Sequence, residues 1–255
     1  MKSDRSIKIL LVDDSESFLM YVSVLLHRMG FKKVIPTNNG ADALKLSRIL
    51  MPDIVLLDIS MPQMDGVTVL RHIKGDVYTS GIPVIMLTIA SDRKSYDACE
   101  RLGCSGYITK PINIAELNHT LYRCISFLTG GKRRQFLRAA FKERVIVTSK
   151  GIRRQHYAVN ISQRGVYIRK KNPLPVGTAV NITLPLKEGG FLNLNGNVIY
   201  IKSVSDELFK MPPGMAIKFN DLTSKDTELL RKYIIEILTK DIIEEQDELI
   251  IKKNF

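Results

Sequence analysis

The chain has 255 residues, with 38 lysine and arginine side chains against 26 aspartates and glutamates, which gives a formal charge of +12. Its composition, 45% hydrophobic and 25% charged, excludes collagen-like and wholly disordered chains and suits one large globular domain or two ordinary ones. No apolar run is long enough to span a membrane, and the three cysteines and four scattered histidines form neither a disulfide framework nor a zinc-hydrolase motif, so we expect a cytoplasmic protein with reduced thiols.

The first half of the chain predicts strands and helices in alternation. Apolar runs predict parallel strands buried on both faces, at 7–12, 33–36, 54–57, 84–87 and 106–108. Helical spacing fills the intervals, at 18–29, 41–50, 67–73, 93–102 and 114–127. Asn113 and Glu116 form a capping-box pattern before the last of these helices. We therefore expect a doubly wound, flavodoxin-like α/β domain over residues 1–127.

A second domain is predicted after a joint marked by the paired glycines Gly130 and Gly131. We expect a flexible, Gly/Arg-rich linker over 128–138. Beyond it, short alternating stretches separated by turn residues predict a small antiparallel β-barrel, with strands at 144–148, 155–161, 165–169, 179–184, 192–202 and 215–219. A closing helix over 226–238 completes a domain that we place at 139–240, and an acidic tail follows at 241–255.

Positive charge is concentrated just after this joint. Residues 1–128 carry 15 basic and 13 acidic side chains, so their charge is nearly balanced. The segment 132–171 carries 13 basic side chains and one acid, Glu143. A positive segment this local predicts an anionic partner, which could be a phosphate ligand, a nucleic acid or a membrane surface.

Acidic and polar side chains follow the strands of the α/β domain. Asp13 and Asp14 follow the first strand, Asp58 and Thr88 follow two later strands, and Lys110 comes soon after the last. Ligands bind at the carboxyl edge of such sheets, so these side chains should meet in one crevice. Crowded carboxylates favour Mg²⁺, while a lysine and a hydroxyl complement a phosphoryl group. Asp58 is then a candidate nucleophile, because carboxylates form aspartyl-phosphate intermediates.

These residues resemble the receiver domain of two-component response regulators, over residues 5–127. The resemblance rests on LLVDDS (10–15), DIVLLDISMPQMDG (53–66), PVIMLT (83–88) and GYITKP (106–111). It implies a phosphoprotein in which Asp58 accepts a phosphoryl group from a histidine kinase or another phosphodonor. It also implies Mg²⁺ bound by Asp14, Asp58 and the carbonyl of Ser60, with Asp13 nearby or acting through a water.

The resemblance further implies a switch around the phosphoryl group. Lys110 would contact the phosphoryl oxygens, and Thr88 and Tyr107 would be the hydroxyl and the aromatic group that reorient. Ile89 departs from the family pattern, which usually has a small residue after this threonine. We expect the Ile89 side chain to hinder access to the site, and a receiver that keeps the fold but phosphorylates poorly is the alternative.

Arginines and short polar residues define a second candidate site. Arg134 and Arg138 lie four residues apart with Arg133 beside them, and Asn160 to Gly165 lie between two predicted strands. Guanidinium groups bind phosphate oxygens and guanine edges, and glycine lets a ligand approach the backbone closely. The combination predicts a site for a compact, doubly charged ligand that carries purines.

This second set resembles a PilZ domain, the bacterial receptor for cyclic di-GMP, over about residues 132–240. The resemblance rests on an RxxxR and an NxSxxG motif, made of Arg134, Arg138, Asn160, Ser162 and Gly165. It implies that the two arginines hold guanine and phosphate of the ligand, often an intercalated dimer, while the NxSxxG residues contact the other guanine face. Arg133 and Arg164 are further candidate contacts on local charge alone.

Together the two resemblances predict a bacterial signalling protein with two inputs. We expect a response regulator that accepts a phosphoryl group, binds cyclic di-GMP and combines both signals in a protein–protein output. It would be a binding and switching protein rather than a metabolic enzyme. Its expected partners are a histidine kinase or other phosphodonor, cyclic di-GMP and an unidentified downstream protein, and a homodimer is left open.

The basic segment allows other functions. A DNA-binding response regulator would use residues 132–171 on phosphates, but these residues are predicted in a loop and strands, with no helix-turn-helix pair. A gel-shift assay at physiological salt separates the two functions. A membrane-surface adaptor would use the same segment but lacks an amphipathic anchor. The acidic run 244–248 would either dock on the basic segment or lie solvated at a helix end.

Overall fold

The computed structural model describes residues 7–89, 93–129, 137–186, 189–203 and 212–240. The chain divides into two compact units, Met1–Gln135 and Phe136–Phe255. Within the described residues, no helix is both long and apolar enough to cross a membrane. Cys99, Cys104 and Cys124 carry free thiols.

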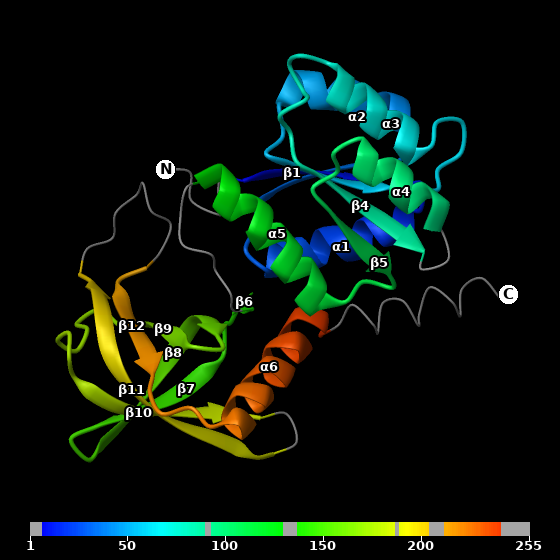
Figure 1. The fold of residues 1–255 in the computed structure, drawn as a ribbon. Helices are drawn as coiled ribbons and strands as arrows, with labels where there is room; N and C mark the ends of the chain where they lie inside the picture. Colours follow the sequence, from blue (N-terminus) through cyan, green and yellow to red (C-terminus); the bar gives the residue numbers. More distant parts are fainter. Residues whose placement is uncertain (1–6, 90–92, 130–136, 187–188, 204–211, 241–255) are drawn as a thin grey trace, which may run out of the picture. The chain divides into compact units, whose positions relative to one another are not determined.

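The first unit is a parallel sheet whose strands alternate with helices (Figure 1). Its elements are β1 (Lys8–Val12), α1 (Glu16–Arg28), β2 (Lys33–Thr37), α2 (Gly40–Leu50), β3 (Ile54–Asp58), α3 (Gly66–Gly75), β4 (Val84–Ile89), α4 (Arg93–Arg101), β5 (Gly106–Lys110) and α5 (Ile114–Thr129). All four strand pairings are parallel, in the order β2-β1-β3-β4-β5. This is the flavodoxin-like order, so the predicted doubly wound sheet is confirmed.

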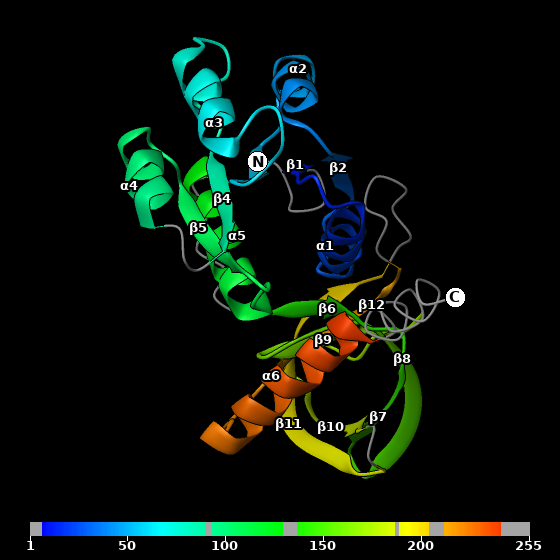
Figure 2. The ribbon, with the colours of Figure 1, turned by 90° about the vertical axis from the view of Figure 1, so that its right-hand side faces the viewer.

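Helices cover both faces of this sheet, which explains why its central strands read as unbroken apolar runs. Leu10, Val12, Val55 and Leu57 are fully buried in one cluster with side chains of α2 and α3. The residues between them, such as Leu11, are equally buried on the opposite face. Figure 2 shows α2 and α3 on one side of the sheet and α1 and α5 on the other. The parallel strands all end at one edge, and the acidic residues follow them there.

The second unit is a closed antiparallel barrel. Its elements are β6 (Arg138–Ala140), β7 (Arg144–Ser149), β8 (Ile152–Ser162), β9 (Gly165–Arg169), β10 (Ala179–Pro185), β11 (Phe191–Lys202), β12 (Gly214–Phe219) and α6 (Ser224–Thr239). The strands follow the order β8-β7-β10-β11-β12-β9, and pairing of β9 with β8 closes the ring. β6 pairs with the C-terminal end of β8, where Arg138 lies opposite Ser162. The predicted barrel with a final helix is therefore confirmed.

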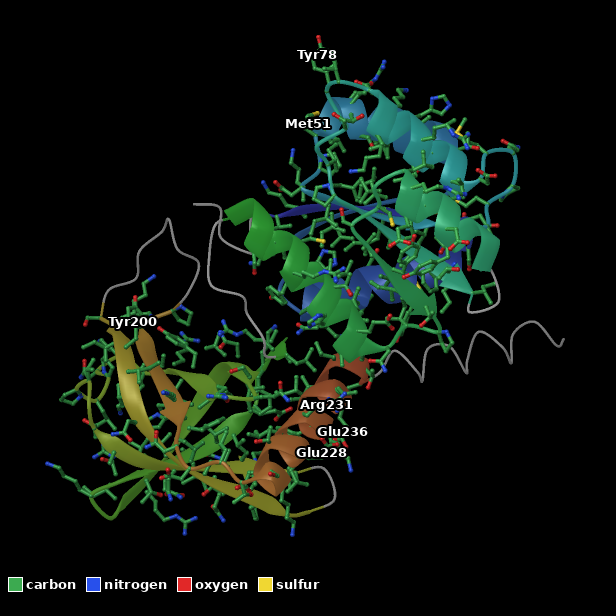
Figure 3. The ribbon with its side chains drawn as sticks, viewed as in Figure 1. Met51, Tyr78, Tyr200, Glu228, Arg231 and Glu236 are labelled. Carbon is green, nitrogen blue, oxygen red and sulfur yellow. The ribbon has the colours of Figure 1, made fainter. Side chains whose placement is uncertain are left out.

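Helix α6 packs its apolar face on this barrel. Thr223 and Asp226 form a reciprocal capping box at its start. Its buried side chains include Tyr233, whose ring meets that of Phe141 edge to face at a centroid distance of 5.8 Å. The opposite face carries exposed charges, and Arg231 lies 3.8 Å from Glu228 there (Figure 3). The amphipathic pattern thus fixes which face of α6 touches the barrel.

Two features of the barrel differ from the predicted elements. Arg138, expected at the end of a flexible linker, begins β6 and pairs with Ser162. β8 begins at Ile152, earlier than predicted, because the two-residue turn of Lys150 and Gly151 continues the hairpin directly from β7. Both turn residues have positive φ, 48° and 75°, as a two-residue type I′ turn requires.

The predicted cap of α5 is present in part. The side-chain oxygen of Asn113 accepts hydrogen bonds from the backbone N–H groups of Ala115 and Glu116, at 2.9 and 3.2 Å. The carboxylate of Glu116 accepts from the hydroxyl of Thr109, at 3.4 Å. The asparagine therefore caps the helix, while the glutamate bonds to the end of β5.

Candidate functional site

Three carboxylates gather at the carboxyl edge of the first sheet. Asp13 and Asp14 directly follow β1, and Asp58 is the last residue of β3. One oxygen from each lies within 4.8 Å of the others, so all three could contact one metal ion. Asp13 and Asp58 are buried, whereas Asp14 is exposed to solvent. We call this partly buried cluster of Asp13, Asp14 and Asp58 the acidic pocket.

The ammonium group of Lys110 lies among these carboxylates. Its Nζ is 2.6 Å from Oδ2 of Asp13 and 2.8 Å from Oδ1 of Asp58. It also lies over the ring of Phe18, 4.4 Å from the ring centroid. Burial alone would lower the pKa of Lys110, but hydrogen bonds to the two carboxylates outweigh burial and raise it. Lys110 is therefore a fixed positive charge beside Asp58.

The charge of Asp58 is only partly compensated. Burial raises the pKa of this carboxyl, because it disfavours the ionised form. The hydrogen bond and charge of Lys110 lower that pKa, whereas the charges of Asp13 and Asp14 raise it again. The net direction is upward. Burial is thus the main reason why Asp58 is harder to ionise, and the two neighbouring carboxylates add to it.

The donor set fits a hard divalent cation. Mg²⁺ prefers oxygen ligands and is held by one or two carboxylates together with phosphate oxygens. Both oxygens of Asp13 already accept hydrogen bonds, Oδ2 from Lys110 and Oδ1, at 3.1 Å, from the backbone N–H of Ser15, whereas Lys110 bonds Asp58 at Oδ1. Asp14 and Asp58 are therefore the better placed ligands. Ser60, whose carbonyl belongs to this set only by the resemblance to receiver domains, lies exposed two residues beyond Asp58.

The N-terminus of α1 positions one wall of the pocket. Ser15 caps this helix, since its hydroxyl accepts from the backbone N–H of Phe18 at 3.3 Å. The backbone of the same serine donates to Asp13. This local turn fixes the Asp13 carboxylate and sets the Phe18 ring in the first turn of the helix, over Lys110.

A tight approach of α3 holds the backbone of Asp58. Asp65 caps α3 by accepting from the N–H of Thr68 at 2.7 Å, and the N–H of Gly66 donates to the carbonyl of Ile59 at 2.9 Å. A Cβ at Gly66 would lie 2.0 Å from the carbonyl oxygen of Asp58. Only glycine lets the helix start this close to the site.

Thr88 and Tyr107, the predicted switch residues, have separate partners. The Thr88 hydroxyl donates to the carbonyl of Ile89 at 3.0 Å. The Tyr107 hydroxyl donates to the carbonyl of Tyr96 at 2.7 Å, and the two tyrosine rings stack at a centroid distance of 3.8 Å. Burial, and then Cys104, raises the pKa of Tyr107, which keeps its hydroxyl protonated. A switch would require both side chains to change partners.

Ile89 lies next to Lys110 at the carboxyl edge of the sheet. It ends β4, and its Cα is in register with that of Lys110 on β5. Its side chain is 58% exposed, although the rest of β4 is buried. A branched apolar side chain therefore stands beside the strand end from which Lys110 reaches the carboxylates.

The second candidate site lies at the hairpin between β8 and β9. Ser162 and Gly165 are paired across this hairpin, with Gln163 and Arg164 in the turn. The Ser162 hydroxyl donates to the carbonyl of Gly165 at 3.1 Å and accepts from the N–H of Arg164 at 3.4 Å. These two bonds fix the turn that presents the exposed side chain of Arg164.

β6 brings Arg138 to this hairpin. Arg138 pairs with Ser162, and its side chain is exposed. The backbone N–H of Leu137 donates to the side-chain oxygen of Gln163 at 3.3 Å. The start of β6 is therefore tied to the turn itself. Arg133 and Arg134 lie outside the described residues.

The strand beside the hairpin supplies the remaining predicted contacts. Asn160 is half-buried and pairs with Tyr167 of β9, next to a bulge in β8. A Cβ at Gly165 would lie 2.3 Å from the carbonyl oxygen of Ile217 on β12. Glycine is therefore required for β9 to pack at this point. Arg138 and the Asn160–Gly165 residues form one polar surface.

Three contributors were not anticipated from the sequence. Phe18 could have been found from its place in the first turn after the Ser15 cap. Gly66 follows the capping Asp65, but nothing in the sequence shows that it faces Asp58. Gln163 lies in an obvious turn, yet its bond to Leu137 joins residues 26 apart and has no local signal.

Comparison with known families finds two domains in the chain. The model of the response regulator receiver domain matches residues 9–122, and that of the PilZ domain matches residues 132–236.

The similar proteins described next each cover about half of this chain. Protein PilH of Pseudomonas aeruginosa is 34% identical over 124 residues, which cover 49% of this chain and 98% of that protein. The polar-differentiation response regulator DivK of Brucella anthropi is 32% identical over 113 residues, which cover 44% of this chain and 91% of the DivK chain. Among solved structures, the signal receiver domain of a histidine kinase from Syntrophus aciditrophicus is 30% identical and covers 50% of this chain and 96% of its own, with a TM-score of 0.46.

Proposed function

Because the chain belongs to the response regulators and carries a receiver domain followed by a PilZ domain, we propose that it accepts a phosphoryl group on Asp58 and binds cyclic di-GMP on its barrel. The observation that carries the first part is the position of Lys110, whose Nζ lies 2.8 Å from Asp58 and 2.6 Å from Asp13. The second part is carried by the polar surface of Arg138 and the β8–β9 hairpin.

In the transfer step, an oxygen of Asp58 attacks the phosphorus of a phosphohistidine or a small phosphodonor. The new O–P bond forms while the bond from phosphorus to the donor breaks, and the donor leaves with that electron pair and takes up a proton. Lys110 lies beside Asp58, so its positive charge can stabilise the negative charge of the phosphoryl oxygens during the transfer.

Mg²⁺, when bound, would neutralise charge on the transferred group, and Asp14, Asp58 and the Ser60 carbonyl are the residues that would hold it. Asp13 has a different task. It is fully buried and bonds to Lys110 and to Ser15, so it orients the lysine toward Asp58.

Phosphorylation would change the partners of Thr88 and Tyr107. A phosphoryl group on Asp58 offers acceptor oxygens that can draw the Thr88 hydroxyl away from the carbonyl of Ile89. Tyr107 would then leave Tyr96, and the surface formed by β5 and α4 would change. That surface is where we expect a downstream protein to read the phosphorylated state.

Cyclic di-GMP would bind through charge and close backbone approach. Arg134 and Arg138 supply guanidinium forks for phosphate and guanine, and Asn160, Ser162 and Gly165 form the facing surface. Arg133 and Arg164 add positive charge. Bound ligand would contact Arg134 together with the hairpin on which Arg138 already pairs with Ser162.

The two inputs would be linked. If phosphorylation changes the affinity for cyclic di-GMP, the ligand must change the phosphorylation equilibrium by the same factor. Calorimetric titration of cyclic di-GMP with and without beryllium fluoride, a phosphoryl mimic, measures this coupling. Identical affinities would refute the coupling but leave the two separate inputs intact.

The phosphoryl input is tested by incubating the protein with acetyl phosphate and Mg²⁺ and separating the products by phosphate-affinity electrophoresis. The wild type should form a phosphorylated species that the Asp58→Asn variant lacks. Asp97→Asn, which changes an exposed carboxylate of α4, is the matched control and should be phosphorylated normally. Labelling of Asp58→Asn at the wild-type rate would contradict this assignment.

A further inference from the structure

Two basic side chains, the half-buried His156 and the exposed Arg154, occupy the inner side of β8 at one end of the barrel. Val145 and Val147 of β7 are buried, and the register pairs them with His156 and Arg154 of β8. Paired residues on antiparallel strands project to the same face of the sheet. His156 and Arg154 therefore lie on the face that is apolar farther along, where Ala158 is buried. Basic residues at positions where the barrel pattern expects apolar ones are found mainly at functional sites.

Lys170 brings a third basic side chain to the same place. Ile168 of β9 is fully buried, and Lys170 is the next residue on that side of the chain. Arg169 pairs with Tyr157 of β8, so continuing the register sets Lys170 opposite His156. Three basic side chains, two from β8 and one directly after β9, thus lie together beyond the buried residues Ala158 and Ile168.

These side chains line a hollow of about 180 Å³, together with Ser149, Lys150 and Leu174. We call it the barrel-mouth pocket. None of its lining residues is acidic. Across the described residues, no ion pair joins Arg154, His156 or Lys170 to a carboxylate.

Electrostatics indicates that the positive charge of this pocket lacks compensation within the described structure. Burial, then Lys170 and then Arg154 lower the pKa of His156. Burial and then Arg154 lower the pKa of Lys170 as well. His156 and Lys170 are thus harder to protonate, first because of burial and then because of neighbouring positive charge, and an anion beside them would oppose the second effect.

We propose that the barrel-mouth pocket binds a terminal phosphate group. Arg154 offers a planar fork of donors, Lys170 a compact charge and Ser149 a hydroxyl, which together suit a phosphate dianion. The hollow is smaller than the roughly 300–1,000 Å³ typical of whole-ligand sites, so it suits one phosphate rather than a dinucleotide.

The pocket is separate from the β8–β9 hairpin. Arg154 precedes Ser162 by eight residues on the same strand, which corresponds to roughly 26 Å at a rise of about 3.3 Å per residue. Occupancy of one site can therefore be measured independently of the other.

The test titrates full-length protein with inorganic phosphate while the His156 ring is followed by NMR. The Arg154→Gln, Lys170→Gln double variant should bind phosphate at least about tenfold more weakly than the wild type, since it loses two charge-assisted contacts. The matched control is Arg153→Gln, Lys171→Gln, which removes the same charge from exposed neighbours outside the pocket lining. The control should bind phosphate like the wild type. Phosphate should raise the pKa of His156 in the wild type and in the control.

Further arms identify where the phosphate comes from. Glycerol 3-phosphate probes a soluble phosphate monoester, and phosphatidylcholine vesicles containing phosphatidic acid probe the same group on a lipid. Binding of either that depends on Arg154 and Lys170 supports the pocket.

Equal weakening in both double variants, or no change at His156, would overturn the proposal. Circular dichroism melting of both variants checks that the barrel remains folded. Cyclic di-GMP is titrated in parallel, so a wild type that binds it but ignores every phosphate probe overturns the pocket alone.

Discussion

The Nζ of Lys110 lies 2.8 Å from Oδ1 of Asp58, so the proposed phosphoryl acceptor is ion-paired before any phosphoryl group arrives. Both side chains are largely shielded from water, with exposed side-chain fractions of 20% and 4%. Lys110 therefore acts in a region of low dielectric, where its charge counts for more than at the surface.

Replacing this lysine should slow phosphorylation strongly. We expect Lys110→Met to lower the rate of phosphorylation by acetyl phosphate by about a hundredfold, because the transition state loses a preorganised positive charge. Phosphate-affinity electrophoresis over time measures the rate. Lys45→Met, at an exposed position of α2, is the control and should keep the wild-type rate. Equal rates for the two variants would contradict the role of Lys110.

The packing of α3 on Asp58 gives a second prediction. Gly66→Ala places a Cβ 2.0 Å from the carbonyl oxygen of Asp58, so backbone must move. We expect a loss of about 1–3 kcal/mol in the free energy of unfolding, measured by urea denaturation, and slower phosphorylation. Gly75→Ala, in the same helix, meets nothing within 4 Å and should not destabilise the protein. A Gly66→Ala variant as stable and active as the Gly75→Ala variant would refute the close approach.

Ile89 should limit access to the acidic pocket. Its side chain is 58% exposed and its Cα is in register with that of Lys110. We expect Ile89→Ala to speed both phosphorylation by small donors and hydrolysis of the aspartyl phosphate several-fold. Hydrolysis is followed by loss of the phosphorylated band after the donor is removed. Unchanged rates in both directions would show that Ile89 does not restrict the site.

The acidity of His156 gives a pH prediction. Its pKa lies below the ordinary value of 6.5, through burial first and then through Lys170 and Arg154. The unfolded chain therefore binds more protons below pH 6.5, so the stability of the barrel should fall as the pH drops from 6.5 toward the lowered pKa. His156→Gln should flatten this dependence in urea denaturation series. An identical slope for wild type and variant would contradict it.

The fold was predictable because both domains follow strong local patterns. Unbroken apolar runs such as Ile54–Asp58 indicate strands covered on both faces, and the parallel connection places Asp13 and Asp58 at one edge. The acidic pocket follows directly, since each of its residues comes at or just after the end of a strand.

The remaining features depend on contacts between distant residues. Arg138 reads as part of a linker, and only its pairing with Ser162 makes it a strand residue. The contact of Phe18 with Lys110 joins α1 to the end of β5. The place of Arg154 in the lining of the barrel-mouth pocket depends on its register with Val147, and a basic residue at an exposed position does not by itself indicate this register.

The most direct test of the two-input account is calorimetric titration of cyclic di-GMP into the full-length wild type and the Arg134→Ala, Arg138→Ala double variant. Arg153→Ala, Arg169→Ala removes the same charge from exposed positions at the far ends of β8 and β9, away from the turn that carries Ser162 to Gly165, and serves as the control. We expect the wild type and the control to bind at micromolar concentrations or below, and the double variant to lose binding. A wild type that shows no binding at these concentrations, or a double variant that binds as tightly, would contradict the account.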